Sequence, residues 1–237
     1  MNFFNRFQGI FLSPQQTFKA ISEKPIWLDA LIILLIAIAL FSYITTPYTN
    51  KDSIQMFENN IKLKERIGEE RFNQMLENLK NPSQTRVIIR SFFIVPISSV
   101  IGFLISSLII LGFGRLTSTE GKFVSIFSAC LYANFIDKIL GNAVRLFLAV
   151  SRKSVMQNTT SLALFFPKLE ITSPAFLILS QVDFFQLWLF GIFGFALAYI
   201  FKIELKKALF ISYGFWLLKS VFYIAIIRLS MSLTGMG

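Results

Sequence analysis

The sequence predicts an all-α membrane protein with five transmembrane helices, an N-terminal interfacial amphipathic helix and a helical extramembrane segment after the first span. Of its 237 residues, 54% are hydrophobic, and a mean hydropathy of +0.63 is too high for a soluble domain of this length. The apolar residues gather in five runs, each close to the roughly 20 residues that a helix needs to cross a bilayer. Most of the 13 acidic and 23 basic residues stand between these runs, as in multi-pass membrane proteins.

Residues 1–25 form the predicted interfacial helix. Ser13 precedes Pro14 and is followed three residues later by Gln16, a pattern typical of an N-cap with proline at the first helical position and a capping-box partner. We therefore expect Ser13 to cap a short helix that begins at Pro14.

The apolar residues of this N-terminal segment are expected to lie in the membrane interface. Phe18 and Ile21 are three residues apart and share one side of the helix, which suits a helix lying in the plane of the membrane surface. Lys24 and Pro25 break that helix, and Trp27 stands where an aromatic belt residue belongs. The alternative is a mobile polar tail, which would leave several Phe side chains in water.

Residues 26–237 form the predicted transmembrane domain. Asp183, followed three residues later by Gln186, predicts a helix cap at the start of the fourth span rather than a catalytic acid. Ser173-Pro174 predicts a short helix before it. The expected spans cover residues 26–46, 91–114, 123–149, 184–201 and 208–233.

The long connection from Lys51 to Arg90 mixes basic and acidic residues with apolar ones at spacings near three and four. This pattern predicts an amphipathic helix or hairpin outside the bilayer, ended by Asn81-Pro82. The remaining connections that would lie on the side of the N-terminus are basic, so the N-terminus is expected in the cytoplasm and the C-terminus outside, in a bacterial cytoplasmic membrane.

The charges inside the spans are the best functional candidates, because a charge at membrane depth costs a few kcal/mol even on lenient scales. Asp137 and Lys138 fall in the third span and Lys219 in the fifth. At about 1.5 Å per residue, Asp137 lies about 22 Å from Lys122 and Lys219 about 18 Å from Lys207. The similar depth predicts an ion pair between Asp137 and Lys219.

Further polar residues of the third span, Asn134, Lys138, Asn142 and Arg145, fall near one face of the helix. One interpretation is a polar stripe that lines a cavity, as a transport path would. The other is that the membrane span ends near Ile136. The stripe would then lie on a solvent-exposed part of the helix above the membrane, with the Arg145 side chain at the outer interface.

Small residues repeat at four-residue spacing in three spans, a pattern that lets helices approach closely. They are Ser98, Gly102 and Ser106; Ser125, Ala129 and Ala133; and Gly194 and Ala198.

Composition excludes several classes of function. The chain has no histidine, and its one cysteine, Cys130, lies inside an apolar run. This excludes intrachain disulfides, Cys/His zinc sites and Ser-His or Cys-His catalysis. The net charge of +10 is explained by orientation signals and anionic lipid, and no nucleic-acid-binding motif is present. We expect no metal or other cofactor, no small-molecule ligand that the sequence can name, and no nucleic-acid partner. The first long apolar run begins at Ile26, too late and too long for a cleavable signal segment.

Three stretches, taken in order, resemble the Yip domain family, named for Ypt/Rab-interacting proteins. The first, LSPQQTFKAISEKPIWLDALI, is similar to the family's opening, in which Pro-x-x-Thr-Phe and Pro-x-Trp precede the first of five spans. TSTEGKFVSIFSACLYANF resembles its Gly-Lys segment before the third span. DFFQLWLFGIFGFALAYIFKIELKKALFISYGFW resembles its fourth span, basic turn and fifth span.

This resemblance implies five helices with a cytoplasmic N-terminus and the C-terminus on the far side. Eukaryotic members are associated with vesicle traffic and Rab GTPases, but the Asp-Leu-Tyr-Gly-Pro element of those members is absent, so the chain looks like a bacterial member to which the Rab role does not carry over. Asn134 to Lys138 stand where many relatives carry a proline.

The sequence thus favours a non-enzymatic integral membrane protein that works through the lipid bilayer, other membrane proteins or self-association. The alternative is a small transporter or channel that uses the third and fifth spans as a polar path, although the Gly/Pro-broken spans of many transporters are missing. An intramembrane enzyme is disfavoured because no constellation of acid, base and nucleophile is present.

Overall fold

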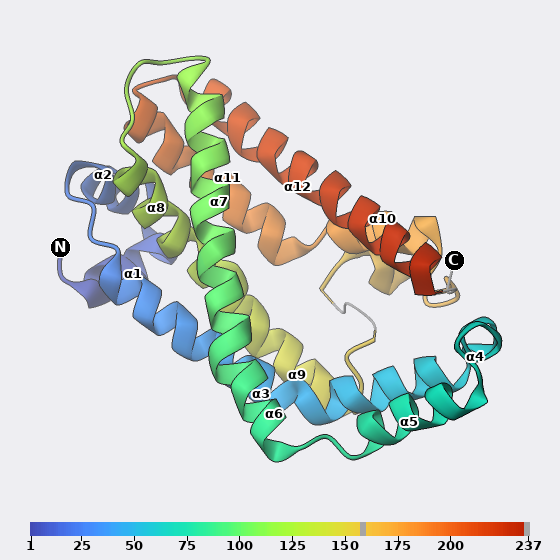
Figure 1. The fold of residues 1–237 in the computed structure, drawn as a ribbon. Coiled ribbons are helices and arrows are strands. Elements are labelled where there is room, and N and C mark those ends of the chain that lie inside the picture. Colours follow the sequence, from blue (N-terminus) through green and yellow to red (C-terminus); the bar gives the residue numbers. More distant parts are fainter. Residues whose placement is uncertain (157–159, 235–237) are drawn as a thin grey trace.

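The computed structural model describes residues 1–156 and 160–234, and these form helices joined by turns, with a single isolated bridge between Ser161 and Asp183. Five helical segments are long and apolar enough to cross a membrane, as predicted: Leu28–Glu58, Gln84–Arg115, Phe123–Arg152, Phe184–Phe201 and Leu205–Leu233. The elements, shown in Figure 1, are α1 (Phe3–Leu12), α2 (Pro14–Glu23), α3 (Leu28–Glu58), α4 (Ile61–Ile67), α5 (Glu69–Lys80), α6 (Gln84–Ile89), η1 (Arg90–Ile94), α7 (Val95–Arg115), α8 (Phe123–Phe135), η2 (Ile136–Gly141), α9 (Asn142–Arg152), η3 (Leu162–Phe165), α10 (Pro174–Gln181), α11 (Phe184–Phe201) and α12 (Leu205–Thr234).

The central helix of the bundle is α8, which is surrounded by α2, α3, α7 and α11. Every residue from Ser125 to Ala133 is buried. Helix α11 contacts α8 and also packs along α12. By contrast, α3, α7 and α12 turn large apolar side chains outward, as helices at the lipid boundary do.

The N-terminal segment forms two short helices that pack on the bundle, rather than one helix whose apolar face meets lipid. Helix α2 begins at Pro14 as predicted, with Ser13 at the N-cap. The predicted side-chain cap by Ser13 is wrong, because the Ser13 side chain makes no cap hydrogen bond. The backbone carbonyl of Ser13 instead accepts a hydrogen bond from Thr17 Oγ1 at 3.0 Å. Phe18 and Ile21 are 0% and 1% exposed, because α2 contacts α8 and α11. These side chains therefore cannot act as lipid anchors.

A buried polar network fastens this N-terminal hairpin to the bundle. Arg6, 6% exposed, pairs with Asp29 at the start of α3, with 2.5 Å between Nη2 and Oδ2. Tyr132 of α8 donates its hydroxyl to the other Asp29 oxygen at 2.9 Å, and the Arg6 guanidinium lies over the Tyr132 ring. A charge-assisted network of this kind fixes geometry as well as adding stability.

The first span is longer than predicted. Helix α3 continues past Thr46, through Pro47, to Glu58, and α5 folds back along its final turns. Phe57 and Phe72 stack there with ring centroids 4.6 Å apart. The predicted extramembrane hairpin is therefore built partly from the extension of the first helix itself.

The second and third membrane-crossing segments each contain a π-helical turn. In the second, η1 ends at Ile94, two residues before Pro96, where the proline has no N–H to continue the regular ladder. In the third, η2 contains Asp137 and Lys138. The third helix continues past Ile136 to Arg152, so the residues of the polar stripe all belong to one continuous helical segment.

The basic connections gather at one end of the bundle, which we call the basic end. There Ser118 Oγ donates to the carbonyl of Phe201 at 2.7 Å, and Lys202 pairs with Glu120 at 3.1 Å. Figure 1 shows α2 and the connection between α7 and α8 on this side, and α4, α5 and α10 at the opposite end.

The small-residue rows divide into two kinds. Ser125, Ala129 and Ala133 are buried in the core, and a Cβ on Gly194 would lie 2.5 Å from Leu209 Cδ2, so close packing explains these positions. A Cβ on Gly102 would meet nothing within 4 Å. Gly102 therefore makes no close helix contact within the described chain.

Candidate functional site: a polar wedge between two outer helices

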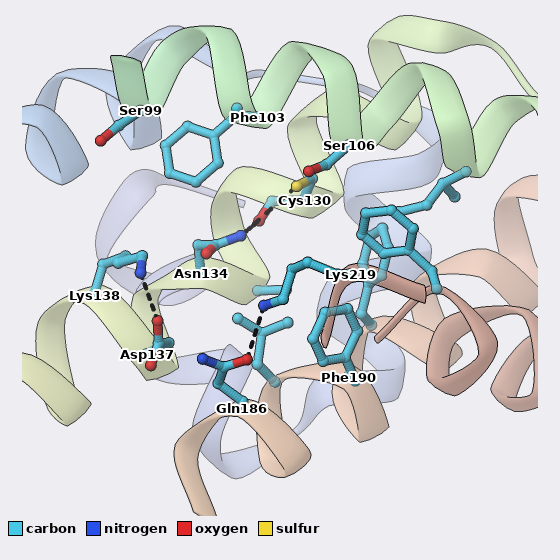
Figure 2. A pocket seen from close by; sticks show the side chains of 16 residues that line it. Ser99, Phe103, Ser106, Cys130, Asn134, Asp137, Lys138, Gln186, Phe190 and Lys219 are labelled. Carbon is cyan, nitrogen blue, oxygen red and sulfur yellow. Dashed lines mark hydrogen bonds and ion pairs between the residues drawn. The ribbon is translucent and has the colours of Figure 1, made fainter. Parts of the chain in front are cut away.

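A half-enclosed pocket of about 260 Å³ lies between α7 and α12, with α8, η2 and α11 behind it. We call this pocket the wedge. Figure 2 shows Lys138, Lys219 and Gln186 grouped at one part of it, with the rings of Phe103 and Phe190 nearby. Its lining residues are Ser99, Gly102, Phe103, Ser106, Ile110, Cys130, Ala133, Asn134, Asp137, Lys138, Gln186, Leu189, Phe190, Phe193, Phe215 and Lys219.

Asp137 is the buried carboxylate of the site, with a side chain only 5% exposed. Its Oδ2 pairs with Lys138 Nζ at 2.8 Å, and its Oδ1 pairs with Arg145 Nη2 at 2.8 Å. The predicted ion pair between Asp137 and Lys219 is therefore wrong, although both residues line the wedge. The π turn provides the physical reason, because it places a carboxylate and two cations of the same helical segment within reach of one another.

Arg145 connects the third membrane-crossing helix to the start of the fourth. Its Nη2 also donates to Asp183 Oδ1 at 2.9 Å, and its guanidinium lies over the Phe185 ring. The same Asp183 oxygen caps α11 as predicted, accepting from the backbone N–H groups of Phe185 and Gln186 at 2.9 and 3.2 Å. Thr160 donates its hydroxyl to the other Asp183 oxygen. One cation thus holds two buried carboxylates together, an arrangement that leaves both of them satisfied.

Lys219 is the cation of the site that has no carboxylate partner. Its Nζ donates to Gln186 Oε1 at 2.7 Å and lies 5.2 Å from the centroid of the Phe190 ring. Within the described part of the chain no carboxylate lies at ion-pair distance from it. The cluster therefore has three cations, Lys138, Arg145 and Lys219, against the carboxylates of Asp137 and Asp183, which leaves one positive charge in excess.

Comparison with protein families identifies the architecture to which this site belongs. A family model described as the Yip1 domain matches residues 9–227, which is most of the 237-residue chain. The chain belongs to the Yip1 domain family. Searches of curated proteins and of solved structures gave no match. The matched range takes in the first four membrane-crossing helices and most of the fifth. The protein is therefore a multi-pass integral membrane protein, and the match confirms the resemblance noted in its sequence.

The wedge of the Yip1 domain has a polar end and an apolar end. Since α7 and α11 run toward the basic end while α8 and α12 run away from it, Ser99, Lys138, Gln186 and Lys219 all lie on the side away from the basic end. Counted along their helices, Lys138 lies about 22 Å from Phe123 and Lys219 about 21 Å from Leu205. For a hydrocarbon core about 30 Å thick that begins at Phe123 and Leu205, these depths are past its middle. Ile110, Phe193 and Phe215 line the part nearer the middle of the bilayer.

The structure brings together most of the residues singled out in the sequence. Asn134, Asp137, Lys138 and Lys219 line the wedge, and Arg145 lies behind it. Asn142 accepts from Arg145 Nη1 at 3.2 Å through its Oδ1, and so supports the cluster from outside the pocket.

Two residues of the site were missed at the sequence level. Gln186 was recognised only as part of the capping pattern and Asp183 only as a cap, yet Gln186 holds Lys219 and Asp183 holds Arg145. The available signal was that both residues stand at the start of the apolar fourth span. Polar side chains at such a position are expected to pair with charged side chains of neighbouring helices.

A second pocket of about 520 Å³ adjoins the wedge and lies between α10 and the last turns of α12. Gln186 and Lys219 line both pockets. The hydrogen bond between these two side chains therefore stands between the wedge and the end of the bundle that carries α10.

Proposed function

We propose that this Yip1 domain protein is non-enzymatic and works by binding lipids or other membrane proteins within the bilayer. The observation that carries this proposal is the wedge itself: it is open beside two outer helices whose large apolar side chains point outward, including Ile101 on α7 and Phe222 on α12. An interaction surface with a polar interior at membrane depth suits partners that approach from the side.

The closed interior of the basic end disfavours the transporter or channel alternative. There the space around α8 is filled by fully buried apolar side chains, among them Phe18, Ile126 and Phe201. The polar groups that line the wedge lie in the other half, and the pocket does not extend through the basic end, whereas a transport route needs access from both sides.

The arrangement of charged groups at the site also disfavours enzymatic catalysis. The two carboxylates are held by cations, and the described residues contain no group of three or more His, Cys, Asp or Glu side chains placed to bind a metal ion. A paired carboxylate is a poor general base, since its lone pairs are already engaged.

Orientation follows from the clustering of basic residues. Lys24, Lys122, Lys202, Lys206 and Lys207 surround the basic end, and excess Lys and Arg mark the cytoplasmic side of short connections. We therefore propose that the N-terminus lies in the cytoplasm of a bacterial cell and the C-terminus outside, with α5 and α10 on the outer side.

A flux assay in proteoliposomes tests this function against the alternative. The full-length protein is reconstituted, and the release of chloride, potassium and a small anionic dye is measured beside protein-free vesicles. We expect no flux above that of the empty vesicles. A flux that Lys219→Met abolishes and Lys207→Met leaves intact would establish the transporter instead.

In-membrane crosslinking tests the positive part of the proposal. A photoreactive amino acid at Phe222, which is 65% exposed, is compared with one at Phe210, which is 82% exposed on the same helix near the basic end. We expect a discrete lipid or protein adduct at Phe222 that is weaker at Phe210. Equal, diffuse labelling at both positions would mean that α12 has no preferred partner beside the wedge.

A further inference from the structure

The excess positive charge of the wedge calls for an anion. Asp137 already contacts Lys138 and Arg145, whereas Lys219 has a neutral amide and an aromatic ring as its closest partners. An ammonium group has three donors, and a cation at membrane depth is stabilised most by a neighbouring opposite charge. The position beside Lys219 and Lys138 is therefore suited to a negatively charged group.

The shape of the wedge is suited to an anion that carries an acyl chain. The charged groups lie past the middle of the bilayer, while Ile110, Phe193 and Phe215 line the part nearer its middle. This is the order of groups in a lipid of the outer leaflet, whose headgroup lies outward and whose chain reaches inward. A volume of about 260 Å³ is enough for a phosphate and part of one chain but not for a whole two-chain lipid, so the rest of the lipid would stay in the bilayer.

The glycine of α7 leaves this chain room. Gly102 lines the wedge, and a Cβ built on it would meet nothing within 4 Å. Glycine lowers helix stability, so an open position of this kind has no packing benefit inside the chain itself. Its effect is to keep the wall of the pocket flat.

We propose that the wedge binds an anionic phospholipid, with the phosphate beside Lys219 and Lys138 and one acyl chain against Gly102, Phe103 and Phe193. This inference rests on the proposed function and names the partner of that same site. Lys219 then exchanges its hydrogen bond to Gln186 Oε1 for one to the phosphate, and Gln186 holds the lysine in place when no lipid is bound.

Native mass spectrometry of the full-length protein in a neutral detergent tests the proposal. Phosphatidylglycerol is titrated beside the zwitterionic phosphatidylcholine, and inorganic phosphate is added as a competitor. We expect one phosphatidylglycerol to bind in preference to phosphatidylcholine and to resist displacement by phosphate. Displacement by phosphate would assign the site to a free anion and overturn the lipid, and equal binding of both lipids would overturn recognition of the charge.

Two pairs of variants locate the binding. Lys219→Met should weaken phosphatidylglycerol binding by about tenfold or more, the size of one charge-assisted hydrogen bond, whereas Lys207→Met removes an exposed charge of the same helix and should not. Gly102→Leu fills the pocket without touching a charge and should also weaken binding. Gly112→Leu is its control, because a Cβ at this position of α7 also meets nothing within 4 Å.

Folding of each variant is verified by its helical circular dichroism and melting temperature. If all four variants fold and bind phosphatidylglycerol as the unchanged protein does, the wedge is not the lipid site. Absent flux together with absent lipid preference would overturn this inference alone, whereas flux that depends on Lys219 would overturn the proposed function.

Discussion

Replacement of Arg145 by methionine should be among the most destabilising single changes outside the apolar core. Methionine keeps much of the length of the side chain but removes the cation that joins Asp137 to Asp183. The two carboxylate side chains are 5% and 0% exposed, and that of Arg145 is 19% exposed. After the change Asp137 keeps Lys138 as a counterion, but Asp183 has none among the described residues and is fully buried.

The expected size of the loss follows from the burial of the pair. Removal of one partner of a buried ion pair costs about 3–5 kcal/mol, because the other charge is left uncompensated. The double variant Arg145→Met with Asp183→Asn should recover a substantial part of that loss. Asparagine is as good an N-cap as aspartate, so α11 keeps its cap while the uncompensated charge is removed.

Unfolding of the purified protein in mixed micelles, followed by circular dichroism, measures these effects. Arg152→Met is the matched control, because Arg152 is an exposed residue of the same helix, α9, where a substitution should change stability by less than about 0.5 kcal/mol. The reasoning is refuted if Arg145→Met costs no more than Arg152→Met. It is refuted equally if Asp183→Asn adds to the loss instead of reducing it.

Three further predictions follow from other parts of the bundle. Gly114→Ala would place a Cβ 1.9 Å from Phe201 Cζ and should cost about 1–3 kcal/mol by overpacking, whereas Gly112→Ala on the same helix, with open space around it, should be neutral or stabilising in the same unfolding assay. Asp29→Asn should release the N-terminal hairpin, because Arg6 loses its charged partner; trypsin should then cut faster at the hairpin while the melting of the bundle changes less, and unchanged cleavage would show that the pair does not hold the hairpin. In a Cys130→Ala background, a membrane-impermeant thiol reagent applied to intact cells should label the outer but not the inner single-cysteine positions, and the reverse pattern would invert the assigned orientation; the outer positions are Asn59 and Ser173, and the inner ones are Ser22 and Thr119.

The pattern of apolar runs was sufficient to predict the five membrane-crossing helices, because hydropathy depends on composition over a whole span. Their ends were less predictable. The first helix runs on to Glu58 although Pro47, Thr49 and Asn50 are poor helix formers, because its last turns pack on α5. No hydropathy signal marks where a helix leaves the membrane and continues in water. The start of α10 at Pro174, with Ser173 as its side-chain cap, was predictable because capping is local chemistry.

The partners of the charged residues could not be predicted in the same way. Counting residues along the third and fifth spans placed Asp137 and Lys219 at similar depth, and both line the wedge. The count assumed regular α-helices, whereas the π-helical turn η2 changes the helical register at Asp137. The N-terminal Phe18 and Ile21 looked like lipid anchors for a related reason: an amphipathic helix has the same pattern whether its apolar face meets lipid or protein. The choice depends on α8 and α11, which are far away in the sequence.

Whether the wedge opens to lipid or to water is the central claim, and spin-label accessibility at Gly102 tests it most directly. Gly102→Cys in the Cys130→Ala background is labelled with a nitroxide and reconstituted in bilayers, and its collision rates with oxygen and with a water-soluble nickel complex are measured. Labels at Phe222 and Asn59 give the lipid and water references. The account predicts frequent collisions with oxygen and few with nickel, as at Phe222; frequent collisions with nickel, as at Asn59, would make the wedge an aqueous cavity and contradict it.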